Sequence, residues 1–413
     1  MQSVDEFARG TEHLEDRDHL VARLARGDRL RIKWGVDPTA PDIHLGHTVP
    51  MRRLRAWQDS GHLPVIVIGD WTARIGDPSG RSETRPPLSA AEVDANAETY
   101  LAQLFSILDR ARTEVRRQAE WFDGMGLAEV LRLCTTRTVQ QLLQRTDFTE
   151  RMAAEHAVGV HELMYPLLQG YDSVAVGADV ELGGTDQLFN LLAARDVQRA
   201  YGQEPQDVVT VPLLEGTDGV RKMSKSYDNY IGIAEPPEAQ FGKAMSIPDD
   251  LIVKYLTLVT DLPASRVDAV ALAMQHGELN PRDAKALLAT AIVRQFHGED
   301  EARRADEEFT RVHRGGGLPD QVPVAEVEMR EWDALELARR VQDASGEARS
   351  SSELRRLLAQ GGIAIMAPSQ HSWRQLRPDQ PVPIVDGTVL RIGKHLYRRL
   401  VPPGAATGAR VDS

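Results

Sequence analysis

Short apolar runs alternate with helix-like segments along the first 230 residues of the chain. Residues 63–68 form an almost uninterrupted apolar run, typical of a strand that is covered on both faces. Further strands are predicted at 30–36, 113–117, 173–176 and 208–213. Helical spacing is clearest over 89–109, where Ser89 and Glu92 form a capping box. This alternation predicts an α/β domain with a parallel sheet wrapped by helices.

The pattern changes after residue 232. Helices are predicted over 250–260 and 263–274, and again from Asn280, which precedes a proline at the first helical position. The glycine-rich stretch 314–319 is typical of a linker. A small α+β region follows, with a helix over 352–360 and a predicted hairpin of strands 382–384 and 389–392 around Asp386-Gly387. We therefore expect these domains: 1–232 (α/β), 233–322 (α-helical), 323–344 (linker) and 345–413 (small α+β).

Composition narrows the class of protein. At 413 residues, two or three domains are expected. The single Cys134 excludes an internal disulfide framework and a cysteine-based metal cluster. The first ten residues contain two acids and no apolar run, and no stretch approaches 18 uncharged apolar residues. We expect a cytoplasmic protein without a signal peptide or a membrane partner.

Charge is unevenly distributed. The whole chain has a net charge of −12, yet residues 345–413 contain ten Lys/Arg and only five Asp/Glu. A basic tail on an acidic body indicates either a local contact with a polyanion or an ordinary solvated face. Charge alone favours the second interpretation slightly.

Two histidines follow a loop rich in proline and aspartate. His44 and His47 open a helix-like segment directly after the strand predicted at 30–36. The two lack a third ligand nearby and a glutamate between them, so we expect no metal site. A helix start above the carboxyl ends of strands is where phosphates bind.

A second segment, Lys222-Met223-Ser224-Lys225-Ser226, lies about 180 residues downstream. Alone, such a stretch is usually a solvated surface loop. Paired with the histidines it indicates a phosphate site, because mobile ammonium groups can close over a leaving pyrophosphate.

Polar residues also gather between these two segments. Tyr165, Gln169 and Asp172 are spaced to share one face of a helix predicted over 161–172. Glycines 183 and 184 end a strand and precede Asp186 and Gln187, which is either a plain turn or a ligand site. The loop 76–81, with Arg85 beyond it, is equally ambiguous.

Together, these segments resemble the signature motifs of class I aminoacyl-tRNA synthetases. The Tyr165, Gln169 and Asp172 set followed by the glycine turn is similar to the bacterial tyrosyl branch with an intact Lys-Met-Ser-Lys-Ser loop. The basic C-terminal region resembles the S4-type RNA-binding domain of that branch. The resemblance covers essentially the whole chain. It implies a Rossmann-like catalytic domain over 1–232, an α-helical domain on the anticodon side over 233–322 and an S4-like α+β domain over 345–413.

The resemblance also implies roles for individual residues. Those assigned to catalysis and the phosphates are Thr39, His44, His47, Lys222, Lys225, Arg81 and Arg85. Those assigned to tyrosine are Asp172 for the phenol, Tyr165, Gln169 and Asp77 for the ammonium, Thr72 nearby, and Gln187 for the carboxylate. Those assigned to ATP are Asp37, Gly46, Gly184, Asp186 and Lys225.

One position departs from the best-known members of the branch. A tyrosine there bonds the substrate hydroxyl, whereas this chain has Lys33. Either its ammonium donates to the phenol oxygen or the side chain points elsewhere.

The implied reaction is formation of tyrosyl-adenylate from tyrosine and ATP with Mg²⁺, followed by transfer to the terminal adenosine of tRNA(Tyr). A homodimer is implied, with an interface around 134–164. The alternatives are a tryptophanyl-tRNA synthetase, a small-molecule nucleotidyltransferase and a non-catalytic RNA-binding paralogue.

Overall fold

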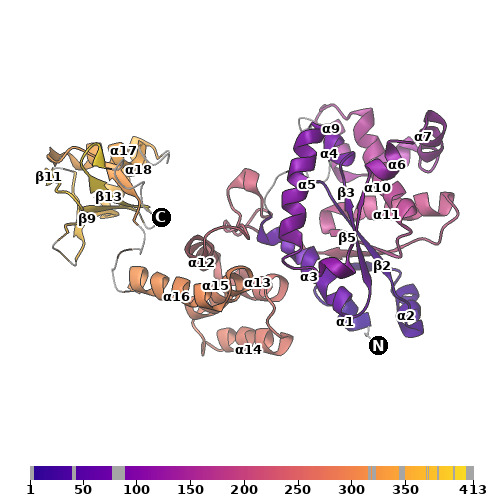
Figure 1. The fold of residues 1–413 in the computed structure, drawn as a ribbon, viewed down its shortest axis with the longest axis horizontal. Coiled ribbons are helices and arrows are strands. Elements are labelled where there is room, and N and C mark those ends of the chain that lie inside the picture. The colour runs from indigo at the N-terminus through magenta and orange to yellow at the C-terminus, as the bar shows by residue number, and fades with distance from the viewer. Residues whose placement is uncertain are drawn as a thin grey trace. The chain divides into compact units, whose positions relative to one another are not determined.

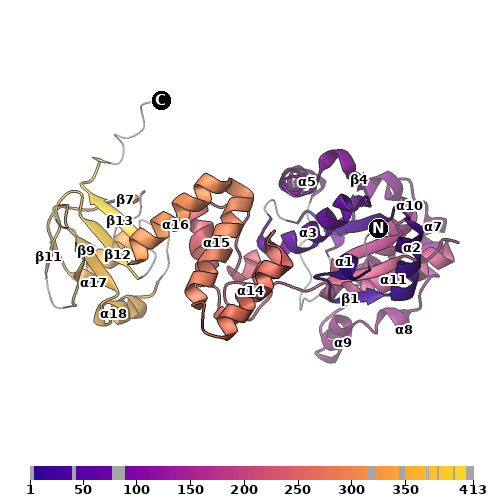
Figure 2. The ribbon, with the colours of Figure 1, turned by 90° about the horizontal axis from the view of Figure 1, so that it is seen from below.

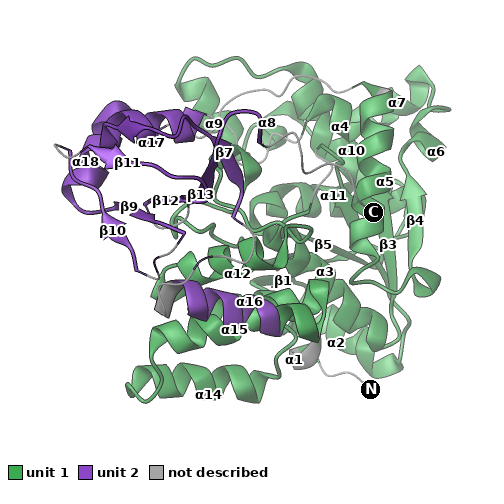
Figure 3. Ribbon diagram, turned by 60° about the vertical axis from the view of Figure 1, so that its left-hand side comes forward, with its two compact units in different colours: residues 1–302 green, residues 303–413 purple. Residues whose placement is uncertain are grey.

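The chain forms two compact units. The computed structural model describes residues 4–39, 43–76, 89–314, 318, 322–343, 349–368, 370, 372–378, 381–393 and 396–405. Unit 1 spans 1–302 and unit 2 spans 303–413 (Figure 3). The division falls inside helix α16 (Glu299–Arg314). Unit 1 therefore contains the strand-rich segment and most of the helical segment that follows it.

Unit 1 is built on a six-stranded sheet with the order β1-β6-β5-β2-β3-β4. The strands are β1 (His13–Glu15), β2 (Arg31–Val36), β3 (Leu63–Ile68), β4 (Glu114–Arg117), β5 (Val180–Gly184) and β6 (Asp207–Val211). All neighbours are parallel except β1, which pairs antiparallel with β6 at one edge. The chain runs outward from β2 to β4 and later adds β5 and β6 on the other side. This reversal creates a topological switch point between β2 and β5, where ligands of such sheets bind.

The apolar runs that predicted strands become the central part of this sheet. Both β3 and β6 are almost completely buried, as expected for strands with helices on both faces. The strand expected at 173–176 is wrong, because these residues form the last turn of α10 (Val160–Val176). Gly177, with a φ of +58°, ends that helix. The strand next to β2 is β5, which begins four residues later.

Helices cover both faces of the sheet. Figure 1 shows α3 (Leu45–Asp59) and α5 (Ala90–Leu104) on one side, and α10 and α11 (Leu188–Ala200) on the other. Ser89 caps α5 in the predicted box with Glu92. The shorter helices are α1 (Val4–Ala8), α2 (Arg17–Arg26), α4 (Thr72–Ile75), α6 (Ala119–Phe122), α7 (Leu127–Cys134), α8 (Val139–Leu142) and α9 (Thr146–Ala153). Three 3-10 turns, η1 (Arg110–Arg112), η2 (Thr185–Gln187) and η3 (Lys225–Tyr227), complete this part.

The rest of unit 1 is helical, as the sequence predicts. It consists of α12 (Pro237–Ser246), η4 (Asp249–Leu251), α13 (Ile252–Val259), α14 (Ala264–Gln275) and α15 (Pro281–His297). Asn280 caps α15 by accepting a hydrogen bond from the backbone N–H of Arg282 at 2.9 Å. Helix α13 packs against α3, which fixes the helical segment to the sheet region. In the part of the chain that the structure describes, no helix is both long and apolar enough to cross a membrane.

Unit 2 is a small α+β unit with a five-stranded sheet of order β10-β9-β12-β13-β7. Its strands are β7 (Val324–Glu326), β9 (Ile363–Met366), β10 (Arg374–Gln375), β12 (Val389–Ile392) and β13 (Leu396–Val401). A separate pair joins β8 (Glu331–Trp332) to β11 (Val382–Pro383). Helices α17 (Ala334–Asp343) and α18 (Ser351–Ala359) lie against the larger sheet (Figure 2).

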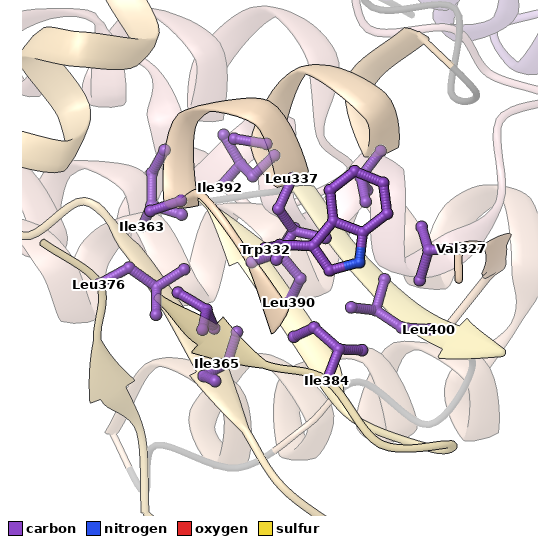
Figure 4. Close-up of a cluster of buried hydrophobic side chains, with 14 of the residues drawn as sticks. Val327, Trp332, Leu337, Ile363, Ile365, Leu376, Ile384, Leu390, Ile392 and Leu400 are labelled. Carbon is purple, nitrogen blue, oxygen red and sulfur yellow. The ribbon is translucent and has the colours of Figure 1, made fainter. Parts of the chain in front are cut away.

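Two expectations for this region need correction. The hairpin between 382–384 and 389–392 is wrong, because β12 pairs with β9 and β13 whereas β11 pairs with β8. The segment 323–344, expected to be a linker, instead contains β7, β8 and α17. Its residues Ala325, Trp332 and Leu337 are buried in one core with Ile363 and Leu390 (Figure 4). This segment is therefore part of the C-terminal fold.

Candidate active site

A cavity of about 570 Å³ opens at the carboxyl ends of the parallel strands. Its walls come from the ends of β2, β3, β5 and β6, so it lies at the switch point of the sheet. Fourteen of the seventeen residues selected from the sequence line it: Asp37, Thr39, His44, Gly46, His47, Thr72, Tyr165, Gln169, Asp172, Gly184, Asp186, Gln187, Lys222 and Lys225. The other three, Asp77, Arg81 and Arg85, lie outside the described residues.

Asp172 forms one end of this cavity. Its Oδ2 accepts a hydrogen bond from Nε2 of Gln118 at 2.8 Å, and its Oδ1 accepts one from Nε1 of Trp121 at 3.1 Å. Burial raises the pKa of Asp172 to about 7, while the charge of Lys33 and these two hydrogen bonds act in the opposite direction. Donors that favour the ionised form leave a carboxylate ready to accept a further hydrogen bond from a ligand.

Gln118 and Trp121 are functional candidates that the sequence analysis missed. Gln118 also accepts a hydrogen bond from the backbone N–H of Thr72 at 2.9 Å. It directly follows β4, and a polar residue at the carboxyl end of a parallel strand is a signal that could have identified it. The sequence around Trp121 contains no comparable pattern, because its role depends on the contact between α6 and Asp172 of α10.

Asp37 is a second centre of hydrogen bonding. Its two oxygens accept hydrogen bonds from the hydroxyls of Tyr165 and Thr72, both at 2.7 Å. Gly69 is needed beside it, because a Cβ at that position would lie only 2.0 Å from Oδ1 of Asp37. Asp37 therefore orients Tyr165 and Thr72 in the wall of the cavity, and its contact with ATP stays a prediction.

His44 and His47 lie at the N-terminus of α3, as the sequence predicts. His44 is the N-cap residue, and the two ring centroids are 3.9 Å apart. Burial, together with the nearby charge of Lys225, lowers the pKa of His44 to about 2 and that of His47 to about 4. Both rings are therefore neutral at pH 7. A Cβ at Gly46 would lie 3.0 Å from the His44 ring, so glycine allows this close packing.

The segment 222–226 closes the same end of the cavity. Nζ of Lys222 lies 3.0 Å from Oδ2 of Asp186, and Lys225 also lines the cavity. Backbone hydrogen bonds join the segment that follows to the start of α3: Leu45 N–H donates to Ile231 at 2.9 Å, and Ile233 N–H donates to Ile43 at 3.1 Å. The two sequence motifs are thus held side by side.

Lys33 does not enter the cavity. Its side chain is completely buried, and Nζ donates to the backbone carbonyl of Gln169 at 2.6 Å and to Oγ of Ser173 at 2.9 Å. Trp34, the next residue, lines the cavity in its place. Of the two interpretations of Lys33, the structure supports the one in which it points elsewhere.

Among the described residues, one cluster has the composition of a metal site. It consists of Asp16, His19 and Asp207, which do not line the cavity. Both ring nitrogens of His19 are already hydrogen-bonded to carboxylates, to Asp207 at 2.8 Å and to Glu204 at 3.1 Å. These contacts make it an ion-pair network of unit 1.

The fold and the cavity define a class I aminoacyl-tRNA synthetase. Residues 25–314 match the sequence family described as tRNA synthetases class I (W and Y). Among solved structures, a C-terminally truncated mitochondrial tyrosyl-tRNA synthetase of Aspergillus nidulans superposes with a TM-score of 0.63 at 25% identity, covering 76% of this chain and 94% of that one. The tryptophanyl-tRNA synthetase of Plasmodium falciparum, at 16% identity and a TM-score of 0.54, shares the fold.

Relatives that match almost the whole chain distinguish between the tyrosyl and tryptophanyl branches. The tyrosine–tRNA ligase of Thermotoga maritima is 47% identical over 400 residues, which is 97% of each chain. That of Dehalococcoides mccartyi strain CBDB1 is 46% identical over 397 residues, covering 95% of this chain and 97% of the relative. The chain belongs to the tyrosine–tRNA ligase family.

Proposed function

We propose that this chain joins tyrosine to its tRNA in two steps. The tyrosine carboxylate attacks the α-phosphorus of ATP in line, pyrophosphate leaves, and tyrosyl-adenylate remains. A hydroxyl of the terminal adenosine of tRNA(Tyr) then attacks the acyl carbon, and AMP leaves. The observation that carries this proposal is the buried carboxylate of Asp172, held by two donors in the wall of the same cavity that both predicted phosphate motifs line.

The phenol of the substrate fits the Asp172 end. Because Gln118 and Trp121 occupy one position on each oxygen, lone pairs remain for the phenol hydroxyl. We assign the substrate ammonium to Gln169 and Tyr165, with Asp77, and the substrate carboxylate to Gln187. A phenylalanine ligand would leave a buried carboxylate partly unsatisfied, which opposes its binding.

The triphosphate fits the opposite end. The N-terminus of α3 carries the positive end of the helix dipole and neutral imidazoles that can donate hydrogen bonds to phosphate oxygens. We assign the phosphates to Thr39, His44, Lys222 and Lys225 and the ribose to Asp186, Gly184 and His47. Arg81 and Arg85 are proposed to meet the pyrophosphate. Catalysis then relies on positioning and on cations that meet developing negative charge.

We place Mg²⁺ on the phosphates rather than in a protein cage. The carboxylates that line the described part of the cavity belong to Asp37, Asp172 and Asp186, and each already accepts hydrogen bonds from protein donors. Mg²⁺ retains water and binds phosphate oxygens readily, so it would supply charge neutralisation without a fixed set of protein ligands.

We propose that unit 2 contacts the tRNA. It carries the basic excess of 345–413, and its surface includes Arg391 stacked on Trp373, with the guanidinium 4.7 Å from the ring centroid. Arginine paired with an aromatic ring is a common surface for RNA.

We propose a homodimer that uses the region around α7 to α10. Leu133, Leu142 and Leu167 of these helices share one buried cluster. In contrast, Leu127 and Val160 are 74% and 77% exposed. Large apolar side chains left exposed beside a packed cluster are typical of an interface between chains.

One experiment tests the function directly. ATP–pyrophosphate exchange is measured with each standard amino acid in turn. We expect tyrosine alone to support exchange. Exchange with tryptophan would instead favour the other branch, and no exchange with any amino acid would indicate a non-catalytic protein.

A further inference from the structure

A completely buried ion pair lies directly behind the proposed tyrosine site. Nζ of Lys33 on β2 is 2.9 Å from Oε1 of Glu181 on β5, and the two side chains are 0% and 1% exposed. They are register partners across the two strands that flank the switch point. Neither residue lines the cavity. Because buried ion pairs often contribute little net stability, the position of this pair suggests another role.

Glu181 fixes the amide of Gln169 in one orientation. Its Oε1 accepts a hydrogen bond from Nε2 of Gln169 at 3.0 Å. On the other side of the amide, Oε1 of Gln169 accepts from Nδ2 of Asn190 at 3.0 Å. A flipped amide would place oxygen against carboxylate and NH₂ against NH₂. Glu181 and Asn190 therefore specify where the amide oxygen of Gln169 lies. That oxygen keeps a second lone pair for a cationic ligand.

Lys33 fixes the helix segment that carries both tyrosine-reading residues. Its ammonium bonds the backbone carbonyl of Gln169 and the hydroxyl of Ser173, which bracket Asp172 along α10. The hydroxyl of Ser173 in turn donates to Oε2 of Glu181 at 3.2 Å. With Glu181 as its third partner, Lys33 uses all three of its donors.

We propose that Lys33 and Glu181 are positioning residues for tyrosine: the ion pair sets the orientation of Gln169 and the place of Asp172. The pair therefore determines affinity and selectivity for the amino acid while leaving ATP binding unchanged. This inference rests on the proposed tyrosine site. It also explains how a lysine at this position serves phenol recognition without touching the substrate.

The test compares Glu181→Gln, Lys33→Met and the double variant Lys33→Met with Glu181→Gln. The double variant removes both charges, because loss of one partner from a buried pair costs about 3–5 kcal/mol and can prevent folding. ATP–pyrophosphate exchange gives KM for tyrosine and for ATP separately, and competition gives the preference for tyrosine over phenylalanine. Asp179→Asn is the matched control. It breaks a 2.5 Å ion pair with Arg23, two residues from Glu181, outside the cavity.

We expect KM for tyrosine to rise at least about tenfold in the folded variants, the effect of one lost oriented hydrogen bond, with KM for ATP within about twofold. The charged groups that act on Asp172 are Lys33 and Glu181. Removal of Lys33 should therefore also move the acid limb of kcat/KM for tyrosine to higher pH. The control should lower thermal stability without changing either KM.

This design distinguishes failure of the proposed function from failure of the positioning role. Exchange by the unmodified enzyme with tyrosine establishes the proposed function on its own. If the folded double variant then keeps the wild-type KM for tyrosine and the wild-type preference over phenylalanine, the positioning role is overturned. Parallel rises in both KM values would overturn it as well, since they indicate a general loss of structure.

Discussion

The ammonium of Lys222 lies 3.0 Å from the carboxylate of Asp186. This contact joins the lysine segment to the turn after β5, and both residues line the cavity. The carboxylate that we assign to the ribose is therefore occupied by a lysine that we assign to the phosphates. Nucleotide binding must exchange one partner of Asp186 for another.

Asp186→Ala is expected to raise KM for ATP about tenfold or more, because the ribose loses a charge-assisted acceptor and Lys222 loses its anchor. KM for tyrosine should change little. Arg221→Ala, at the exposed residue directly before the lysine segment, is the control. An unchanged KM for ATP in the exchange assay would remove Asp186 from the nucleotide site.

Lys225→Ala is expected to slow adenylate formation about 10²–10³-fold, the range for loss of one group that stabilises developing charge. Tyrosine affinity should be preserved, since Lys225 lies at the phosphate end of the cavity. Rapid-quench measurement of tyrosyl-adenylate separates the two quantities. A burst with wild-type rate would contradict the role assigned to this lysine.

Tyrosine recognition should depend on pH through Asp172. Burial raises the pKa of this carboxyl to about 7 in the empty site. The ionised form, which accepts the phenol hydrogen bond, is lost as pH falls through that value. KM for tyrosine should therefore rise between pH 8 and pH 6, whereas KM for ATP should not follow the same curve.

Asp172→Asn supplies the control for this pH dependence. It should abolish the dependence and reduce the preference for tyrosine over phenylalanine by about 10–100-fold. A variant that retained the wild-type pH profile would show that another group titrates.

Fold stability should respond to pH through His19. The protonated His19 ring donates hydrogen bonds to the carboxylates of Asp207 and Glu204, which raises the pKa of His19 above 6.5, so the folded state binds its proton more tightly than the unfolded state. The stabilisation is complete below pH 6.5 and is lost as pH rises through the folded pKa. Burial also raises the pKa of Asp207, and this shift has the same sign.

Thermal unfolding between pH 6 and pH 8.5 measures this effect. The decline in melting temperature that begins near pH 6.5 should be smaller in His19→Gln. It should persist in His156→Gln, because His156 is exposed. Identical slopes in both variants would assign the dependence to other groups.

Leu337→Ala should destabilise unit 2 by about 2–5 kcal/mol, because Leu337 is fully buried in its core. Val385→Ala, at a half-exposed position of the same unit, is the control. If unit 2 binds tRNA, the Leu337 variant should lose tRNA charging at elevated temperature while tyrosine-dependent pyrophosphate exchange continues. Equal loss of both activities would argue against a separate role for unit 2.

The sequence predicted the parts of the fold that depend on local pattern. The apolar run of β3 and the capped starts of α5 and α15 depend on neighbouring residues, and the structure confirms them. The structure also brings the two sequence motifs to one cavity, while their role in phosphate binding stays a prediction. The prediction of a strand at 173–176 is wrong. Val174 and Val176 have strand propensity, but they belong to α10, which packs against α11. Tertiary packing overrides propensity in such short segments.

Other parts depend on partners that are distant in the sequence. The orientation of Lys33 is set by Glu181, 148 residues later, and no periodicity in the sequence reveals that pairing. Trp121 acquires its role only where α6 meets Asp172 on α10. Strand β8 was missed because two residues give no detectable alternation, although Trp332 is central to the unit 2 core.

The backbone bonds between residues 43–45 and 231–233 have a consequence for how the phosphate end can vary. They use only main-chain atoms, so exchanging side chains leaves them intact. Side chains around the proposed triphosphate site can therefore change in charge and size while these main-chain hydrogen bonds keep the distance between the start of α3 and residues 231–233 constant.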